Sequence, residues 1–302
     1  MSRQVDRMAE PADKKKMRLI VASCSRHSLV ARRRSFGLTN VNNRTGTLGL
    51  HEALEMLGYT PYHMIDLMLK GRKPHIKAFT EGILAHNNRF SGIKRYETPD
   101  LDRWIGSFDC LMEIPSYIGL RALAGYIEDP DVKFIVTERS PDKWVKSFNK
   151  TIGEAIMAGH KFPLNILRRF HSEVGQFFNL AEVMYWAYSD GTNPGHPNNE
   201  AALRKNYVEY NSIREVKETL PKDRLLVVRL EDGLGWEEIC PFLDVSIPEE
   251  KYPRGNEPDK FHKIIEDYLE PKLKAAMINL GTFVVTVAGI GGYLGWRYYR
   301  GH

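Results

Sequence analysis

The stretch RTGTLGLHEALEMLGYTPYHM, residues 44–64, decides the fold. It places a Thr-Gly-Thr turn directly before residues 48–57, where leucines recur at helical spacing. Backbone N–H groups at a helix N-terminus can bind an anion, Gly46 lets the backbone approach that anion, and Arg44 adds a positive charge. We therefore expect an anion-binding turn ahead of a helix, with an ordinary helix cap as the alternative.

Short apolar runs alternate with helical patterns along the rest of the chain. We expect strands at residues 19–22, 59–63, 108–112, 134–137 and 225–230. Helical patterns cover residues 48–57, 143–152, 164–188 and 201–220. This alternation predicts an α/β domain over residues 18–270, a doubly wound parallel sheet flanked by helices, with ligands bound at the carboxyl ends of the strands.

A second motif, TERSPDKWVKS, occupies residues 137–147. The strand pattern ends here, Ser140 can cap a helix, and Pro141 suits the first turn of that helix. Arg139 then lies at the strand tip, and Ser147 lies two turns into the helix. A phosphate resting on the start of the helix would contact both residues; a surface arginine and a neutral helical serine are the alternative.

Together, the two motifs resemble the sulfotransferases that use 3′-phosphoadenosine 5′-phosphosulfate (PAPS), whose fold is of the P-loop type. The fungal-type branch of that family has a first strand, then RTGT, then ALE-LG-Y-P-YHM, and the spacing of Arg139 and Ser147 matches the family's 3′-phosphate motif. Residues 235–243, GWEEICPFL, and residues 251–256, KYPRGN, resemble two later segments of that branch. The resemblance spans residues 18–256.

The resemblance implies an in-line transfer of a sulfuryl group from PAPS, as cosubstrate, to a hydroxyl group. Catalysis would rest on positioning and charge stabilisation, without a metal ion. The 5′-phosphosulfate would be held by backbone N–H groups of Thr45, Gly46 and Thr47, with Arg44 neutralising the leaving phosphate. The 3′-phosphate would be held by Arg139, Ser147, Arg254 and Gly255.

The acceptor hydroxyl needs a general base, and the resemblance indicates where to find it. Glu113 follows the strand expected at residues 108–112, at the place where the branch carries Asp-x-Pro. Since a longer carboxylate can play the same role, Glu113 is the predicted catalytic base. His63 is the second candidate for a catalytic role, with a core or capping histidine as its structural alternative.

One segment departs from the family pattern, in which the first strand runs almost directly into RTGT. Here residues 27–44 intervene, and deleting them gives LIVASCSRTGTLGL, in which Arg26 becomes the arginine of the donor loop. We interpret residues 27–44 as an insertion. It is either a true loop across the donor site or a retained intron in the gene prediction.

The basic residues are concentrated at one end of the chain. The net charge is +5, yet residues 1–44 hold 11 Lys and Arg against 3 Asp and Glu, whereas the remaining 258 residues hold 32 against 35. The near-neutral body argues against nucleic-acid binding. Residues 1–17 are polar, and we expect a disordered basic tail whose lysines at 14–16 could contact acidic lipids. Three widely spaced cysteines argue against a disulfide scaffold or a zinc ribbon.

The C-terminal region carries a membrane signal. Residues 275–296 hold no charged residue and would rise about 33 Å as a helix, which matches a bilayer core. Basic and aromatic residues flank this segment, as at a membrane interface. We expect a C-terminal tail anchor with the domain on the cytosolic side; a buried core helix is the alternative. The spacing of Gly291 and Gly295 suits the packing of two such helices, so a homodimer is a further expectation.

The sequence thus predicts a membrane-anchored sulfotransferase that acts on a small, lipophilic hydroxyl compound. Aromatic residues between positions 170 and 188 would cap the acceptor site, with core packing as the alternative. Two other interpretations stay open. One is a P-loop phosphate-binding fold with changed chemistry, and the other is a membrane-anchored pseudoenzyme or scaffold that keeps the fold without the reaction.

Overall fold

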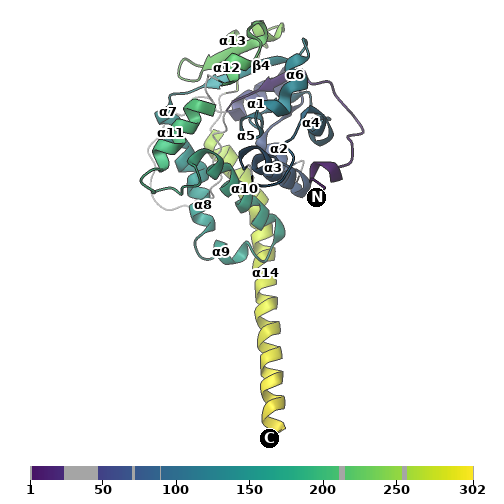
Figure 1. The fold of residues 1–302 in the computed structure, drawn as a ribbon, viewed down its shortest axis with the longest axis vertical. Helices are drawn as coiled ribbons and strands as arrows, with labels where there is room; N and C mark the ends of the chain where they lie inside the picture. The colour runs from purple at the N-terminus through teal and green to yellow at the C-terminus, as the bar shows by residue number, and fades with distance from the viewer. Residues whose placement is uncertain are drawn as a thin grey trace.

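A five-stranded parallel sheet forms the centre of the domain (Figure 1). The computed structural model describes residues 2–23, 47–69, 72–88, 90–210, 215–253 and 257–301. The strands are β1 (Leu19–Val21), β2 (Pro61–Tyr62), β3 (Cys110–Met112), β4 (Lys133–Glu138) and β5 (Leu225–Arg229). Their order is β2-β3-β1-β4-β5, and every pairing is parallel. The predicted doubly wound α/β sheet is confirmed.

Both faces of this sheet are covered, as an all-parallel sheet requires. Successive side chains of β1 point to opposite faces, so Ile20 joins one core cluster while Leu19 and Val21 join the other. Helices that contribute to the two clusters include α1 (Thr47–Met56), α3 (Arg72–Asn87), α4 (Thr98–Ile105), α7 (Pro141–Phe148), α10 (Ser172–Ser189) and α13 (Trp236–Leu243). Since each large apolar side chain contributes about 1.5–3 kcal/mol on full burial, the clusters hold the strand ends firmly in place.

Further helices and turns complete the domain. The helices are α2 (Met64–Leu69), α5 (Pro115–Ile118), α6 (Ala124–Glu128), α8 (Glu154–Gly159), α9 (Leu164–Leu167), α11 (Asn199–Tyr210) and α12 (Glu215–Thr219). The 3-10 turns are η1 (Val5–Arg7), η2 (Leu120–Leu123) and η4 (Lys222–Arg224), and η3 (Asn149–Gly153) is π-helical.

Two helical patterns of the sequence are not single α-helices. The pattern over 143–152 runs from α7 into η3, and the pattern over 164–188 is split into α9 and α10. The pattern over 201–220 includes α11 and α12, and residues 211–214 lie outside the described residues. Before α10, the backbone of His171 is extended, with φ −146° and ψ 121°. Apolar spacing does not reveal this break because a polar residue makes it.

Residues 2–17 pack on the domain, which corrects the expectation of a disordered tail. Val5, in η1, is fully buried. Arg3 bridges two carboxylates, because its Nη2 lies 2.7 Å from Asp100 Oδ1 and 2.9 Å from Asp6 Oδ1. The composition of this segment predicted solvation, but one buried valine and a long-range ion pair to α4 hold it in place.

The helix α14 (Glu257–Arg300) extends far beyond the domain (Figure 1). Over the part of the chain that the structure describes, its segment Lys263–Arg300 is the one helix long and apolar enough to cross a membrane, by length and composition alone. Only 6% of its most apolar window is buried, which argues against a core helix. Near its exit from the domain, Asn279 Nδ2 donates to Phe170 O at 2.8 Å, and the rings of Phe170 and Phe283 lie 5.5 Å apart.

Candidate active site

The loops that follow the strands meet at the carboxyl edge of the sheet. Because the strands are parallel and in register, the residues after β1, β2, β3 and β4 lie along the same edge. They include Ser23, His63, Glu113 and Arg139. The edge therefore collects most of the described side chains for which the sequence predicts chemistry.

Glu113 is held in an unusual backbone conformation. It follows β3 with a φ of +63°, in the left-handed region that residues other than glycine rarely occupy. Its N–H donates to Val21 O at 3.1 Å, and the N–H and Oγ of Ser116 donate to Glu113 O at 3.1 and 2.6 Å. Its side chain is fully buried. Such a conformation costs about 1–3 kcal/mol and persists only where the surroundings impose it, so the fold sets the position of this carboxylate.

Two side chains hold the Glu113 carboxylate. Thr47, the first residue of α1, donates through Oγ1 to Glu113 Oε1 at 2.5 Å. His63 Nε2 lies 3.3 Å from Glu113 Oε2 and 3.4 Å from Thr47 Oγ1. The N–H of Ile65 donates to His63 Nδ1 at 3.2 Å, so Nδ1 is the acceptor and Nε2 carries the proton. His63 therefore points its Nε2–H at the predicted base.

Asp66 supports this arrangement, although the sequence patterns did not single it out. Its Oδ2 accepts from the His63 N–H at 3.0 Å and lies 3.1 Å from His51 Nε2. His63 precedes α2, and Asp66 reaches back to it from the third helical position, as in a capping box. The spacing His63-x-x-Asp66 is the signal that could have found it. The capping role expected as an alternative for His63 thus coexists with its contact to Glu113.

Arg139 lies at the tip of β4 with part of its guanidinium buried. Its N–H donates to Tyr207 OH at 3.1 Å, and Tyr207 OH donates to Arg139 O at 3.0 Å, which fixes its backbone. Nη1 is buried, and no described residue offers it a hydrogen-bond acceptor. Burial lowers the pKa of Arg139 from its ordinary value. A buried cationic donor without an acceptor is costly, which suits a site for a bound anion.

The helix that follows Arg139 is anchored by aromatic stacking. Trp144 of α7 stacks on Tyr207 of α11 and on Phe148, with ring centroids 4.5 Å apart in each pair. Ser147 lies on the same helix and is partly exposed. The structure therefore places Arg139 and Ser147 at a strand tip and on the next helix, as the sequence predicts.

Ser23 joins the ends of β1 and β4. Its Oγ accepts from Thr137 N at 3.0 Å and from Thr137 Oγ1 at 2.8 Å, and its side chain is fully buried. No sequence pattern indicated this residue. Its contacts keep the strand before the predicted donor loop aligned with the strand that carries Arg139.

Several predicted site residues lie outside the described residues. They are Arg26, Arg44, Thr45, Gly46, Arg254 and Gly255, together with the proposed insertion at 27–44. Of the predicted phosphosulfate loop, the described part of the chain thus includes Thr47 alone. Within that same part, no group of three or more His, Cys, Asp and Glu side chains could hold a metal ion.

Comparisons with known proteins point to one family. The family model for the sulfotransferase domain matches residues 42–261. The Ava biosynthesis cluster protein M of Aspergillus versicolor is 30% identical over 214 residues, which cover 70% of this chain and 76% of that protein. A crystal structure of a sulfotransferase from Alicyclobacillus acidocaldarius matches with 13% identity and a TM-score of 0.34, covering 89% of this chain and 96% of that one.

Proposed function

Because this chain belongs to the sulfotransferase domain family and is a transferase enzyme, we propose that it moves a sulfuryl group from PAPS to a hydroxyl group of a small, lipophilic acceptor. One observation carries the proposal. The buried Glu113 carboxylate lies at the carboxyl edge of the sheet, 3.3 Å from His63 and hydrogen-bonded to Thr47 at the start of α1. A base in this position is adjacent to the helix N-terminus proposed to hold the phosphosulfate.

The donor would lie between two helix starts, α1 and α7. The 3′-phosphate would accept a hydrogen bond from Arg139 Nη1, the buried donor that has no acceptor among the described residues, and from Ser147. The 5′-phosphosulfate would rest on the N-terminus of α1 at Thr47, where the helix dipole favours negative charge. PAPS itself supplies the activated sulfuryl group. The other residues proposed to bind it are Arg26 or Arg44, Thr45, Gly46, Arg254 and Gly255.

Glu113 would act as the general base. Its carboxylate takes the proton of the acceptor hydroxyl while the acceptor oxygen attacks sulfur, and the bond between sulfur and the bridging oxygen of the 5′-phosphate breaks. The product 3′-phosphoadenosine 5′-phosphate leaves, and its developing negative charge lies near the N-terminus of α1 and the loop arginine. The His63 N–H and the Thr47 hydroxyl keep the carboxylate in one orientation during the transfer.

The acceptor is proposed to be lipophilic because an enzyme held at a membrane would meet lipophilic compounds there, and two aromatic residues lie close to Glu113 in the chain or fold. Tyr117 follows Glu113 in α5, and its ring meets that of Tyr188 edge to face at 5.2 Å. Tyr188 OH donates to Ser116 O at 2.8 Å. Most of the aromatic residues of α10 pack in the core, which favours the core interpretation for Phe177, Phe178 and Tyr185. Tyr117 and Tyr188 are buried in the same core cluster, so the proposal of a lipophilic acceptor rests on the membrane placement proposed for α14.

The helix α14 would hold the enzyme at a membrane, with the domain on the cytosolic side. Exposed apolar side chains run from Met277 to Trp296, and Arg297 and Arg300 follow in the last turn. This order matches an apolar span with an interface of aromatic and basic residues. Resistance of the full chain to extraction from membranes at alkaline pH would support this placement, and complete release would refute it.

The donor is tested by calorimetric titration of the full chain, kept in detergent micelles, with 3′-phosphoadenosine 5′-phosphate. We expect saturable binding. The matched variant lacks residues 27–44: binding by both forms supports a loop compatible with the site, and binding by the shortened form alone shows that the segment blocks it. If neither form binds although both unfold cooperatively on heating, the proposed donor is wrong.

A further inference from the structure

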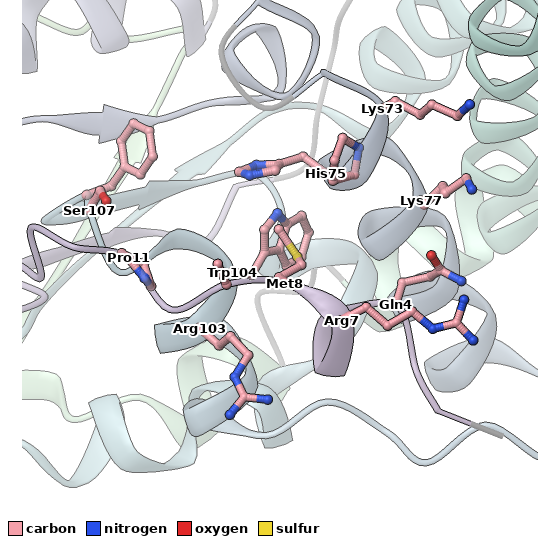
Figure 2. Close-up of a pocket in the computed structure, with 13 residues that line it drawn as sticks. Gln4, Arg7, Met8, Pro11, Lys73, His75, Lys77, Arg103, Trp104 and Ser107 are labelled. Atoms are coloured by element: carbon pink, nitrogen blue, oxygen red, sulfur yellow. The ribbon is translucent and has the colours of Figure 1, made fainter.

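A cavity lies at the opposite edge of the sheet from Glu113. It has a volume of about 800 Å³, is open to solvent, and is lined by the N-terminal segment, the start of α3, the end of α4 and the loop before β3 (Figure 2). Ser107 and Phe108, which line it, precede β3, whereas Glu113 follows that strand. The cavity is therefore separate from the proposed sulfuryl-transfer site.

The lining of this cavity is cationic. The side chains of Arg7, Lys73, Lys77 and Arg103 stand around it (Figure 2). No Asp or Glu is present among the described residues that line it. Carboxylates lie outside the lining: Arg103 Nη2 is 3.6 Å from Glu10 Oε1, and Glu81 Oε1 accepts from the N–H of Gln4 at 2.7 Å. Asp6, next to Arg7, pairs with Arg3. The excess positive charge favours an anionic ligand.

The start of α3 strengthens this preference. The positive end of a helix dipole is normally complemented by acidic residues, yet the first turn of α3 has none. Lys73 and Lys77 instead add positive charge to this end of the helix. Such an arrangement opposes helix stability unless an anion lies there, and backbone N–H groups at a helix N-terminus are suited to bind one.

The floor of the cavity is apolar and aromatic. Trp104 is 2% exposed and lies beside Phe108 and Met8 in the lining. The ring of Tyr62, behind the floor, meets Phe108 at 4.8 Å and Trp104 at 6.1 Å. A cavity with a cationic rim and an apolar floor matches a ligand with an anionic head and an apolar body.

The rim of the cavity is linked to the membrane side of the domain. Lys73 Nζ donates to Ser172 Oγ at 3.3 Å, and Phe170, two residues earlier, contacts α14 through Asn279. We infer that this cavity binds an anionic membrane lipid, with the phosphate head group on the cations and the start of α3, and the adjoining acyl chain on the aromatic floor. That the lipid comes from the membrane rests on the placement proposed for α14. The preference of the cavity for an anionic ligand does not depend on that placement.

Two lysines near the N-terminus have carboxylate partners within the protein. Lys14 Nζ lies 2.6 Å from Glu10 Oε2, and Lys16 Nζ lies 2.5 Å from Asp131 Oδ2 and 3.3 Å from Asp129 Oδ2. Lys15 Nζ donates to the hydroxyl of Thr60 at 2.6 Å. None of the three lysines lines the cavity, so the expected contact of this basic run with acidic lipids is separate from the inference drawn here.

Short-chain lipids test the inference without requiring a bilayer. The full chain in detergent is titrated with dihexanoyl phosphatidic acid, dihexanoyl phosphatidylcholine and inorganic phosphate. We expect the anionic lipid to bind about tenfold or more tightly than either other probe. The double variant Lys73→Gln, Lys77→Gln should weaken that binding by about 10- to 30-fold, because each lysine near a lipid phosphate contributes roughly three- to fivefold in affinity.

Matched variants distinguish an effect at the cavity from an effect of the overall charge and from misfolding. Lys14→Gln combined with Lys205→Gln removes the same charge elsewhere and should change lipid binding by less than about twofold. Ala9→Trp adds bulk to the cavity lining without changing charge and should abolish lipid binding. Unchanged unfolding temperatures and unchanged binding of 3′-phosphoadenosine 5′-phosphate show that the fold and the proposed donor site are intact.

The possible outcomes separate this inference from the proposed function. Equal binding of the choline lipid, equal binding of inorganic phosphate, or equal losses in the two double-lysine variants would each overturn the lipid site. None of these results bears on the donor site, because the readout is lipid binding rather than sulfuryl transfer. Conversely, if the unchanged chain binds the anionic lipid but does not bind 3′-phosphoadenosine 5′-phosphate, only the PAPS proposal is refuted.

Discussion

The two edges of the sheet handle charge in opposite ways. At the carboxyl edge, the buried Glu113 carboxylate is met by Thr47 and by the N–H of His63, and Asp66 in turn fixes His63. At the opposite edge, where the strands begin (the amino edge), cations from three segments line a cavity that has no carboxylate among its described lining residues. The Glu113 cluster finds its partners within the protein, whereas the cavity presents cationic side chains with no carboxylate among its described lining residues.

The difference reflects the physical requirements of the two proposed sites, the catalytic group and the lipid-binding cavity. A catalytic group must be held in one orientation, so its hydrogen bonds are made within the protein before any substrate arrives. A lipid site needs uncompensated charge and open volume. Each of the following predictions tests one side of this contrast.

The largest effect is expected at the base. Glu113→Gln should lower kcat for sulfuryl transfer by about 10²- to 10⁴-fold, because the amide cannot take the acceptor proton. Binding of 3′-phosphoadenosine 5′-phosphate should be unchanged, as calorimetry would show. Glu113→Asp, which restores the carboxylate of the fungal-type pattern, should retain part of the activity. Full activity of the Gln variant would mean that Glu113 is only structural.

A smaller loss is expected at the tip of β4. Arg139→Ala should weaken binding of 3′-phosphoadenosine 5′-phosphate by about 10- to 100-fold, since a charge-assisted hydrogen bond contributes about 1.5–3 kcal/mol. Arg121→Ala is the control, because that arginine is exposed and pairs with Glu97. Similar titration curves for both variants would remove Arg139 from the donor site.

Stability measurements test how firmly the carboxyl edge is held. Asp66→Ala leaves the buried N–H of His63 without its acceptor and should lower the free energy of unfolding by about 1–3 kcal/mol. Asp131→Ala removes an exposed pair with Lys16 and should cost less than about 1 kcal/mol. Urea denaturation followed by tryptophan fluorescence compares the two. Equal losses would contradict the tightly held cluster.

A buried histidine at the amino edge should make the stability of the fold depend on pH. Burial lowers the pKa of His75 from 6.5 to about 4. Below pH 6.5 the unfolded chain binds a proton at this residue that the folded chain does not, so stability falls with pH down to about pH 4 and is lower by about 2 kcal/mol at pH 5.

Replacing His75 checks this pH response. Unfolding temperatures recorded between pH 7 and 5 should fall less steeply in His75→Gln than in the unchanged chain. His196→Gln, at an exposed histidine, is the control and should behave like the unchanged chain. Parallel curves for all three proteins would mean that His75 titrates normally in the folded chain.

The sequence indicated individual residues of the candidate site, but it did not indicate which of them lie in contact. It indicated Glu113 and His63 as competing candidates for one role, whereas the structure places them 3.3 Å apart in one cluster. Residues that follow different strands come together because parallel strands end at one edge. Asp66 was missed because its role depends on capping α2 at His63, which apolar spacing does not report.

Predictions from local sequence patterns were wrong where the structure depends on contacts between segments that are far apart in the chain. The N-terminal segment has the composition of a solvated tail, yet Val5 and the pair between Arg3 and Asp100 dock it on α4. Without that docking there would be no wall for the lipid cavity. Its cations come from the N-terminal segment, α3 and α4, so no motif in the sequence marks it.

The sequence by itself determined the strand and helix alternation, the family and the long apolar helix, because each of these is written in local periodicity or in a contiguous motif. Only the tertiary structure decided which side chains meet. Burial of Glu113 at a positive φ, its contact with His63 and the cavity beside α3 all depend on contacts between residues far apart in the chain. Packing, rather than local conformational preference, sets those contacts.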